Sequence, residues 1–359
     1  MDALVLVGGE GTRLRPLTYS VPKPMLPIVE RPMIARVIEW LALHGVTRAV
    51  FSLGYQSDIF VQAFPAGRWA GVELHYVVEP EPLDTAGAIL FGAVQAGLDD
   101  ETLIVVNGDV LTDLDVASLV AFHFGHGGEA TIALTPVEDP SAYGVVPVDD
   151  RGRVLAFIEK PPRDEAPTNL INAGTYVLEP AALRRIASGR RVSIEREVFP
   201  ALVGDGALFA MASDAYWLDT GTPERYLQAQ LDVLRGLRPL VLLPECLELL
   251  PGVHVAPSAV LEGQAGGNAF VGDSAVVARG GRVEDTVVGA SARVEAGAVV
   301  TGSVLLPGAV VCEGARVEGS LVGPRALIGA GAVLAELCVV GADAVVADGC
   351  VLGSARLPV

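Results

Sequence analysis

The last third of the chain, from residue 251 to residue 359, repeats a six-residue pattern. Each copy has an aliphatic residue, often a glycine, two variable residues, a small residue and one more residue. The copies at 271–276, 288–293 and 294–299 read VGDSAV, VGASAR and VEAGAV, and others begin at residues 311, 322, 328, 340 and 346. This register is typical of a parallel β-helix. Three hexads form one triangular coil, in which the aliphatic residue points inward and the small residue fits the corner.

Residues 1–237 show a different pattern, in which short apolar runs alternate with helical spacing. The run at 3–7 predicts a strand buried on both faces, and the spacing at 32–44 predicts a helix. The alternation predicts an α/β domain with a Rossmann-like, mixed but mostly parallel sheet, whose ligands bind at the carboxyl ends of the strands. Further strands are expected at 49–53, 74–78, 103–106, 130–136, 144–148, 154–159 and 171–177, and further helices at 85–96, 179–186, 193–202 and 222–237. The proline-containing stretch 238–250 is the expected linker to the β-helix domain, 251–359.

Composition excludes several classes of partner. The chain has 25 Lys and Arg residues against 43 Asp and Glu residues, a formal net charge of −18, which argues against a nucleic-acid partner. No apolar run reaches the ~18 residues of a membrane span, and no leader pattern is recognised, so no membrane partner and a cytoplasmic location are expected. The cysteines show no CxxC spacing and are expected to be reduced. The three in the repeat region are expected to be buried: Cys312, Cys338 and Cys350.

Only two lysines occur in the chain, and proline flanks both. Lys23 lies in PKP and Lys160 in EKP, whereas all other basic residues are arginines. An ammonium is a compact point charge that suits a single phosphate oxygen in a crowded site, where a guanidinium fork is too wide. The alternative is that both are ordinary surface lysines.

A glycine-rich loop follows the first predicted strand directly. Gly8, Gly9 and Gly11 allow a sharp turn and a close approach to a ligand, so that backbone N–H groups can point at phosphate oxygens. Arg13 and Lys23 would neutralise the phosphate charge. The chain has no Gly-Lys-Ser/Thr, which excludes a Walker A loop, and lacks the third glycine of a dinucleotide fingerprint.

A series of motifs in this order resembles the signature of the sugar-1-phosphate nucleotidyltransferases. The motifs are GGEGTRLRPLT at 8–18, PKPM at 22–25, NGD at 107–109, EKP at 159–161, NAGTY at 172–176 and WLDTGTP at 217–223. The resemblance covers the whole chain, and its similarity to hexapeptide-repeat proteins implies that the β-helix is left-handed. Within the family, the chain is most similar to the branch that transfers GMP from GTP to mannose 1-phosphate, which implies GDP-mannose and pyrophosphate as products.

The resemblance also implies roles for individual residues. Arg13 and Lys23 would hold the triphosphate and stabilise the transition state, while Asp109 and Asp219 would hold Mg²⁺. Read without the resemblance, Asp109 is a turn residue and Asp219 a helix cap. The implied nucleotide-binding residues are Gly8, Gly9, Gly11, Thr12, Arg13, Lys23, Thr85, Gly87 and Asp109. The implied sugar-phosphate residues are Gly144, Glu159, Lys160 and Asn172.

Base and sugar choice stay open at one position. The guanylyltransferases of the family usually have LGTAG where residues 83–87 read LDTAG, so Asp84 replaces a glycine. Its carboxylate could accept hydrogen bonds from guanine, or it could cap the helix that begins at Thr85. The alternative activity is transfer to glucose 1-phosphate from dTTP, UTP or ATP.

Two other classes of function are less favoured. Acyl transfer by hexapeptide-repeat enzymes usually needs a base histidine, and the repeat region has only His254, at its start. A non-catalytic regulator would not need the full set of charged motif residues. Because the β-helix has flat faces and an exposed edge coil, a homo-oligomer formed through it is expected.

Overall fold

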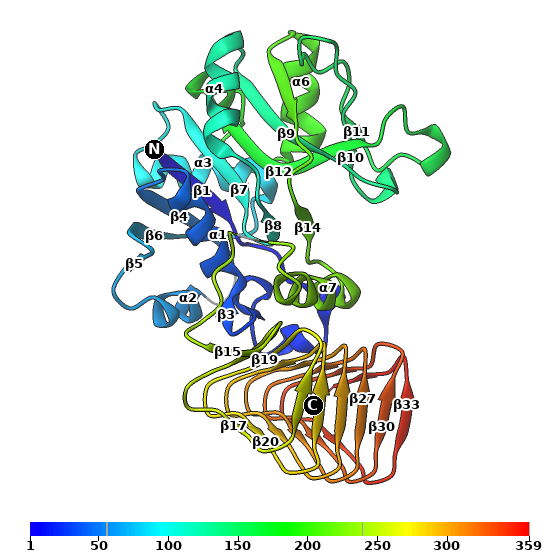
Figure 1. Ribbon diagram of the computed structural model, residues 1–359. Coiled ribbons are helices and arrows are strands. Elements are labelled where there is room, and N and C mark those ends of the chain that lie inside the picture. The colour runs from blue at the N-terminus through cyan, green and yellow to red at the C-terminus, as the bar shows by residue number, and fades with distance from the viewer. Residues whose placement is uncertain (55–56, 239, 359) are drawn as a thin grey trace. The chain divides into compact units, whose positions relative to one another are not determined.

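The computed structural model describes residues 1–54, 57–238 and 240–358, so Pro239 of the predicted linker and the terminal Val359 lie outside it (Figure 1). The chain divides into two compact units, which are described separately. The first unit contains residues 1–9 and 37–217, and the second contains residues 10–36 and 218–359. No helix in the described part of the chain is long and apolar enough to cross a membrane.

The first unit is built on a ten-stranded mixed sheet, as predicted. Its centre is parallel, in the order β7 (Leu103–Asn107), β1 (Asp2–Leu6), β4 (Arg48–Leu53) and β6 (Val72–Val78). β12 (Leu170–Leu178) runs antiparallel to β7. The remaining strands are β5 (Arg68–Trp69), β9 (Ala130–Pro136), β10 (Gly144–Val145), β11 (Ile158–Glu159) and β13 (Leu208–Ala212).

Two predicted strands of this sheet are shorter than expected. The predicted strands 144–148 and 154–159 reduce to β10 and β11, with one isolated bridge between Val148 and Val154. Pro147 lies inside the first of them and has no N–H to donate to a ladder, which explains the interruption. β13 was not predicted from the sequence; it pairs parallel with β9.

Helices pack against this sheet through apolar side chains. Leu4, Val50, Ile89, Val105 and Tyr176 belong to one buried cluster between the sheet and its helices. α2 and α4 were not predicted, because α2 is short and α4 is apolar without a clear 3.6-residue period. The helices of the first unit are α2 (Ser57–Ala63), α3 (Asp84–Ala96), α4 (Val116–His126), α5 (Pro180–Leu183) and α6 (Phe199–Gly204), and α1 (Met33–Leu43) begins in the second unit and ends in the first.

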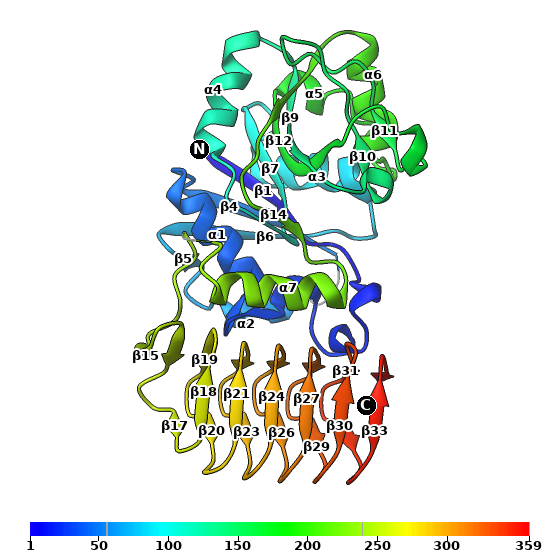
Figure 2. The same cartoon turned by 45° about the vertical axis from the view of Figure 1, so that its right-hand side comes forward.

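The repeat region of the second unit is a parallel β-helix of three stacked sheets, which confirms the fold predicted for it (Figure 2). One sheet runs from β15 (Leu247–Leu250) to β34 (Arg356–Leu357), with β15 antiparallel to its neighbour. The others contain β17 (Val260–Leu261) to β32 (Val345–Val346) and β18 (Gln264–Gly266) to β33 (Val351–Gly353). Val283, Val300, Val317 and Leu334 stack inside it in register.

Most coils of the β-helix are one residue shorter than three hexads. Val287 pairs with Val304, and Val304 with Leu321, a repeat of 17 residues. In each 17-residue coil, one of the three segments has five residues instead of six and ends in a hydroxyl residue. This hydroxyl bonds to the backbone at the corner. Ser303 Oγ, for example, donates to Thr301 O at 2.7 Å and accepts from Ser320 N at 3.0 Å. Cys338 continues this ladder and is buried, but Cys312 and Cys350 are partly exposed, so their predicted burial was wrong. All four cysteines are free thiols.

The second unit also contains the segment 10–36 and α7 (Pro223–Leu234). Within the segment, β2 (Pro27–Ile28) and β3 (Arg31–Pro32) form a hairpin with the two-residue turn Val29–Glu30. Both turn residues have positive φ, 46° and 67°. α7 holds the hairpin, because the Gln230 amide accepts from Val29 N at 2.8 Å and donates to Pro27 O at 2.6 Å.

Candidate active site

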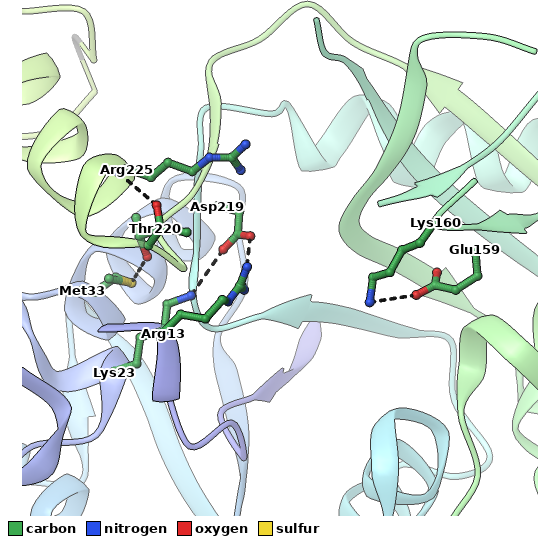
Figure 3. Close-up of polar contacts among 9 residues, drawn as sticks. Arg13, Lys23, Met33, Glu159, Lys160, Asp219, Thr220 and Arg225 are labelled. Carbon is green, nitrogen blue, oxygen red and sulfur yellow. Dashed lines mark hydrogen bonds and ion pairs between the residues drawn. The ribbon is translucent and has the colours of Figure 1, made fainter. Parts of the chain in front are cut away.

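Two cations and one carboxylate of the predicted site meet in the second unit. Lys23 Nζ lies 3.3 Å from Asp219 Oδ1, and Arg13 Nη2 lies 3.9 Å from Asp219 Oδ2 (Figure 3). The side chains of Lys23, Asp219 and Arg13 are 6%, 18% and 66% exposed. The site therefore combines a buried ammonium, a shielded carboxylate and a guanidinium that is open to solvent.

Glycines leave the room that this cluster needs. Gly11 has a φ of 61°, and a Cβ there would lie 3.0 Å from Lys23 Cβ. A Cβ on Gly221 would lie 2.6 Å from Arg13 Nη2 and 2.9 Å from Asp219 Oδ1. The N-cap of α7 is Thr222, whose side chain accepts from Arg225 N, so the alternative that Asp219 caps this helix is wrong.

Arg225 is a third cation near this cluster, and the sequence analysis did not assign it. It is half-buried in the first turn of α7 (Figure 3), where a positive charge opposes the helix dipole. Burial and the nearby Arg13 lower its pKa from the usual value. A basic residue two positions after the helix-starting Thr-Pro was the signal available in the sequence.

The sugar-phosphate residues lie on neighbouring strands of the first unit. Gly144 of β10 pairs with Glu159 of β11, and Lys160 follows at once. Lys160 Nζ lies 3.2 Å from Glu159 Oε1, its side chain is 58% exposed, and its φ is 50° (Figure 3). A Cβ on Gly144 would lie 2.5 Å from Phe157 Cζ, so only glycine fits there. A non-glycine residue held at positive φ at a strand end is a feature of functional sites.

Asn172 lies next to this pair of strands, at a register shift in β12. Its amide donates to Tyr176 Oη at 2.9 Å, and its carbonyl accepts from Gly174 N at 2.9 Å. Burial raises the pKa of Tyr176, so this phenol stays neutral and can accept the bond. In this structure Asn172 thus shapes the strand, and its contact with a sugar stays a prediction.

Trp217 and Tyr143 support the same region, and the sequence analysis gave neither a role. Trp217 Nε1 donates to Ala173 O at 2.8 Å, and its ring meets the Tyr143 ring edge-on at 5.5 Å. Lys160 N donates to Tyr143 O at 2.9 Å. The tryptophan of the WLDTGTP motif was the available signal.

Asp109 lies in the turn between β7 and β8 (Val110–Thr112), at the carboxyl end of a central strand. Gly108 N donates to Leu6 O at 2.9 Å, and a Cβ on Gly108 would lie 2.5 Å from Val7 Cγ1. The packing of Gly108 therefore fixes where Asp109 leaves the sheet. Asp109 belongs to the first unit and Asp219 to the second.

The donor types of these two aspartates fit a hard divalent cation. Carboxylate oxygens are the ligands that Mg²⁺ prefers, and it keeps several positions for water and phosphate oxygens. Within residues 1–54, 57–238 and 240–358, no cluster of three or more His, Cys, Asp or Glu side chains forms a complete protein cage for a metal. Each carboxylate is thus a candidate metal ligand by its chemistry, and its contact with a metal ion stays a prediction.

The predicted nucleotide residues of the first unit have structural contacts of their own. Gly8 and Gly9 are exposed at the end of β1. The Thr85 hydroxyl donates to Glu195 Oε2 and accepts from Ile194 N, both at 2.8 Å. Gly87 N donates to Val192 O at 3.2 Å. Thr85 and Gly87 therefore hold α3 against the segment 192–195, and their contact with a nucleotide stays a prediction.

Asp84 has a left-handed backbone conformation, which explains why relatives with the LGTAG motif have glycine at this position. Its φ is 62°, its side chain is exposed, and Oδ1 accepts from the adjacent Thr85 N at 2.8 Å. Aspartate tolerates the left-handed region better than most residues. The helix begins at Asp84 itself, after Leu83, and no side chain caps it, so the alternative in which Asp84 is the cap is wrong.

Family comparisons agree with this architecture. The family described as nucleotidyl transferase matches residues 2–236, and the GMPPB C-terminal domain matches residues 265–358. The chain belongs to the nucleotidyl transferase family and is a nucleotidyltransferase enzyme with a C-terminal β-helix.

Among its relatives, the mannose-1-phosphate guanylyltransferase of Mycobacterium tuberculosis is 41% identical over 306 residues, which are 84% of this chain and 83% of that protein. The mannose-1-phosphate guanyltransferase of Schizosaccharomyces pombe is also 41% identical, over 73% of each chain. Among solved structures, HddC from Yersinia pseudotuberculosis is 30% identical with a TM-score of 0.57, over 65% of this chain and 99% of that one. A second HddC structure is complexed with GMP-PN.

Proposed function

We propose that the protein transfers GMP from GTP to mannose 1-phosphate and releases pyrophosphate and GDP-mannose. The observation that carries this proposal is the buried Lys23, which shares its partner Asp219 with Arg13 behind a glycine turn. Support for the choice of substrates comes from the two guanylyltransferase relatives at 41% identity.

Charge neutralisation and positioning supply most of the catalysis in such a transfer, because both substrates are polyanions. The backbone of Gly8, Gly9, Gly11 and Thr12 would bind the triphosphate oxygens, with Arg13 and Lys23 neutralising their charge. The attacking sugar-phosphate oxygen is already ionised near neutral pH, so no protein residue needs to act as nucleophile or general base. Thr85 and Gly87 would contribute to the base side of the nucleotide pocket.

The sugar phosphate would bind at the edge formed by β10, β11 and β12. Lys160 would pair with its phosphate, Glu159 would accept hydrogen bonds from its hydroxyls, and Gly144 and Asn172 would complete the pocket. Asp109 and Asp219 would hold Mg²⁺. When bound, this ion supplies further neutralisation of the phosphate charge.

The proposal includes the setting in which the enzyme works. Four free thiols support a reducing, cytoplasmic location. A homo-oligomer formed through the β-helix is supported by the exposed Leu247, Leu249 and Leu250 of the edge strand β15.

The test is a pyrophosphate-release assay that crosses four nucleoside triphosphates with the 1-phosphates of mannose, glucose and N-acetylglucosamine. We expect GTP with mannose 1-phosphate to have the highest kcat/KM, and the release to stop when EDTA removes Mg²⁺ and to return when Mg²⁺ is restored. A higher kcat/KM for glucose 1-phosphate with dTTP, UTP or ATP would favour the alternative activity. Full release in EDTA would refute the metal assignment.

A further inference from the structure

We propose that Arg356, on the last strand of the β-helix, is a positioning residue for Arg13 and so sets the affinity for the nucleoside triphosphate. Its Nη1 donates to Arg13 O at 3.0 Å and to Arg15 O at 3.4 Å. One guanidinium nitrogen thus bridges two carbonyls of the turn that carries Arg13. The proposal rests on the function proposed above, in which Arg13 binds the triphosphate.

The turn itself is short, and at its start the Thr18 hydroxyl donates to Gly11 O at 2.8 Å. It is a single 3-10 turn, Thr12–Leu14, which starts after the left-handed Gly11 and has no side-chain cap. Leu14, the last residue of the turn, is buried, but the Arg13 side chain is largely exposed. The carbonyls that end such a turn have no partner within it, so an external donor decides how well it is fixed.

The terminal coils of the β-helix are shaped to receive this turn. Gly341 packs against Pro16, and a Cβ on Gly341 would lie 3.1 Å from Pro16 Cβ. Gly341 N also donates to Leu357 O at 2.8 Å, which ties the coil that faces Pro16 to the strand that carries Arg356. The loop and the terminal coils therefore meet through the apolar contact of Pro16 with Gly341 and through the hydrogen bonds from Arg356.

The charge of Arg356 is directed at the loop rather than at another side chain. In the described part of the β-helix, Arg282, Arg293 and Arg325 each pair with a carboxylate, whereas Arg279, Arg316 and Arg356 do not. Of these three, Arg356 is the one that donates to backbone carbonyls of the loop, Arg13 O and Arg15 O. Its positive charge thus adds to that of Arg13 and Arg15 at one end of the loop, where a polyanion is expected to bind. Among the described residues, the Arg356 guanidinium has no acidic partner and donates to two backbone carbonyls of the loop. These contacts allow it to orient the loop.

The position of Arg356 makes this contact sensitive to the end of the chain. Its strand, β34, is last in its sheet and pairs with β31 (Val339–Val340) on one side only. Terminal strands open more easily than central ones. The hydrogen bonds from Arg356 therefore couple the order of the last coil to the order of the Arg13 turn.

The test compares Arg356→Ala with Arg316→Ala in the full chain. Arg316 is also an exposed first residue of a β-helix strand, β27 (Arg316–Glu318), and is the matched control. For Arg356→Ala we expect a rise of about tenfold in the KM for GTP, as follows from losing hydrogen bonds to a charged donor. The KM for mannose 1-phosphate should change less than twofold, and Arg356→Lys, which keeps a charged donor, should recover most of the affinity for GTP.

Hydrogen exchange of residues 11–19 gives a second readout that does not need activity. Exchange there should be faster in Arg356→Ala and unchanged in Arg316→Ala. An unchanged KM for GTP overturns the proposal even if exchange becomes faster. Arg356 would then order the turn without positioning Arg13 for the triphosphate. If the wild-type chain releases no pyrophosphate with any substrate pair, the proposed function fails instead, and unchanged exchange would separately overturn the contact.

Discussion

At the scale of single residues, the central feature is that the chain buries a lysine. The Lys23 side chain is 6% exposed and has Asp219 as an ion-pair partner at 3.3 Å. An ammonium removed from water needs a counter-charge, and a phosphate could take that role in addition to Asp219. The ion pair therefore stabilises the protein when no ligand is bound. When a ligand is bound, Lys23 is placed to contact its phosphate as well.

We predict that Asp219→Asn destabilises the protein by about 1–3 kcal/mol, because it leaves Lys23 buried beside a neutral amide. Urea unfolding at neutral pH measures this change. Asp343→Asn is the matched control, because it removes the carboxylate of an exposed pair with Arg325 and should cause no measurable change. Equal stability of wild type and Asp219→Asn would show that other contacts satisfy Lys23.

Candidate site residues could be named from the sequence at this scale, but their side-chain contacts could not. The two lysines and the glycine turn identified candidate residues by composition alone. The sequence could not show that Thr85 and Gly87 bond to the segment 192–195, because those contacts join positions more than 100 residues apart. Arg356 was missed for the same reason, because a terminal repeat arginine has no local signal.

At the scale of elements, the hairpin turn Val29–Glu30 depends on its surroundings. Two-residue turns with positive φ favour glycine or asparagine, and a β-branched residue there is strained. Gln230 binds Val29 N, and the Glu30 carboxylate accepts from Asp273 N at 3.2 Å. Gly272 is required next to it, since a Cβ there would overlap the carboxylate. The sequence lacks a turn signal here because tertiary contacts supply the conformation.

We predict that Glu30 makes stability depend on pH. Burial raises its pKa above the ordinary 4.5, while the hydrogen bond from Asp273 N opposes this rise and the charge of the Asp273 carboxylate adds to it. A raised carboxyl pKa means that the folded state binds the proton more tightly than the unfolded state. The stability gained from this is complete below the unfolded pKa and is lost as pH rises through the folded pKa.

The measurement is urea unfolding of wild type and Glu30→Gln at several values from about pH 4 to pH 7. The free energy of unfolding of wild type should fall relative to that of Glu30→Gln as the pH rises. Glu10→Gln, at an exposed loop position, controls for general effects of removing a carboxylate. A difference that stays constant, or that grows with pH, would contradict the assigned cause.

In the repeat region, periodicity predicts which residues point inward but not the length of each coil. Inward aliphatic positions, such as Val283 and Val300, were correctly placed by the pattern. The 17-residue coil was missed because the shortened corner ends in Thr or Ser, and the hexad pattern tolerates a missing polar residue. The extra residue before Cys338 is accommodated by positive φ at Glu336 and Leu337, which no local signal predicts.

At the scale of the whole molecule, the compact units do not follow the order of the chain. The segment 10–36 groups with the β-helix and α7, whereas the strands on either side of it in sequence belong to the first unit. Periodicity indicates which face of an element is buried, but not which distant element covers it. The sequence therefore predicted the two architectures correctly and could not show that the β-helix supports the segment that carries Arg13 and Lys23.

This support leads to a prediction for a chain that ends after residue 250. HddC matches 65% of this chain over 99% of its own length, so a chain of about that extent can form the nucleotidyl transferase fold. In this protein, the cut removes Asp273 from Glu30, Gly341 from Pro16 and Arg356 from Arg13. Contacts from α7 to the hairpin remain, so the segment 10–36 should loosen rather than the sheet unfold.

We expect the shortened chain to keep its far-ultraviolet circular dichroism signal for the α/β sheet, to exchange amide hydrogens of residues 10–36 faster, and to lose at least about tenfold in kcat/KM for GTP. The loss should exceed that of Arg356→Ala, because three anchors are removed instead of one and their effects add when the anchors are well separated. Kinetic constants equal to those of the full chain would mean that α7 alone orders the segment. In that case the β-helix would serve assembly and not the site.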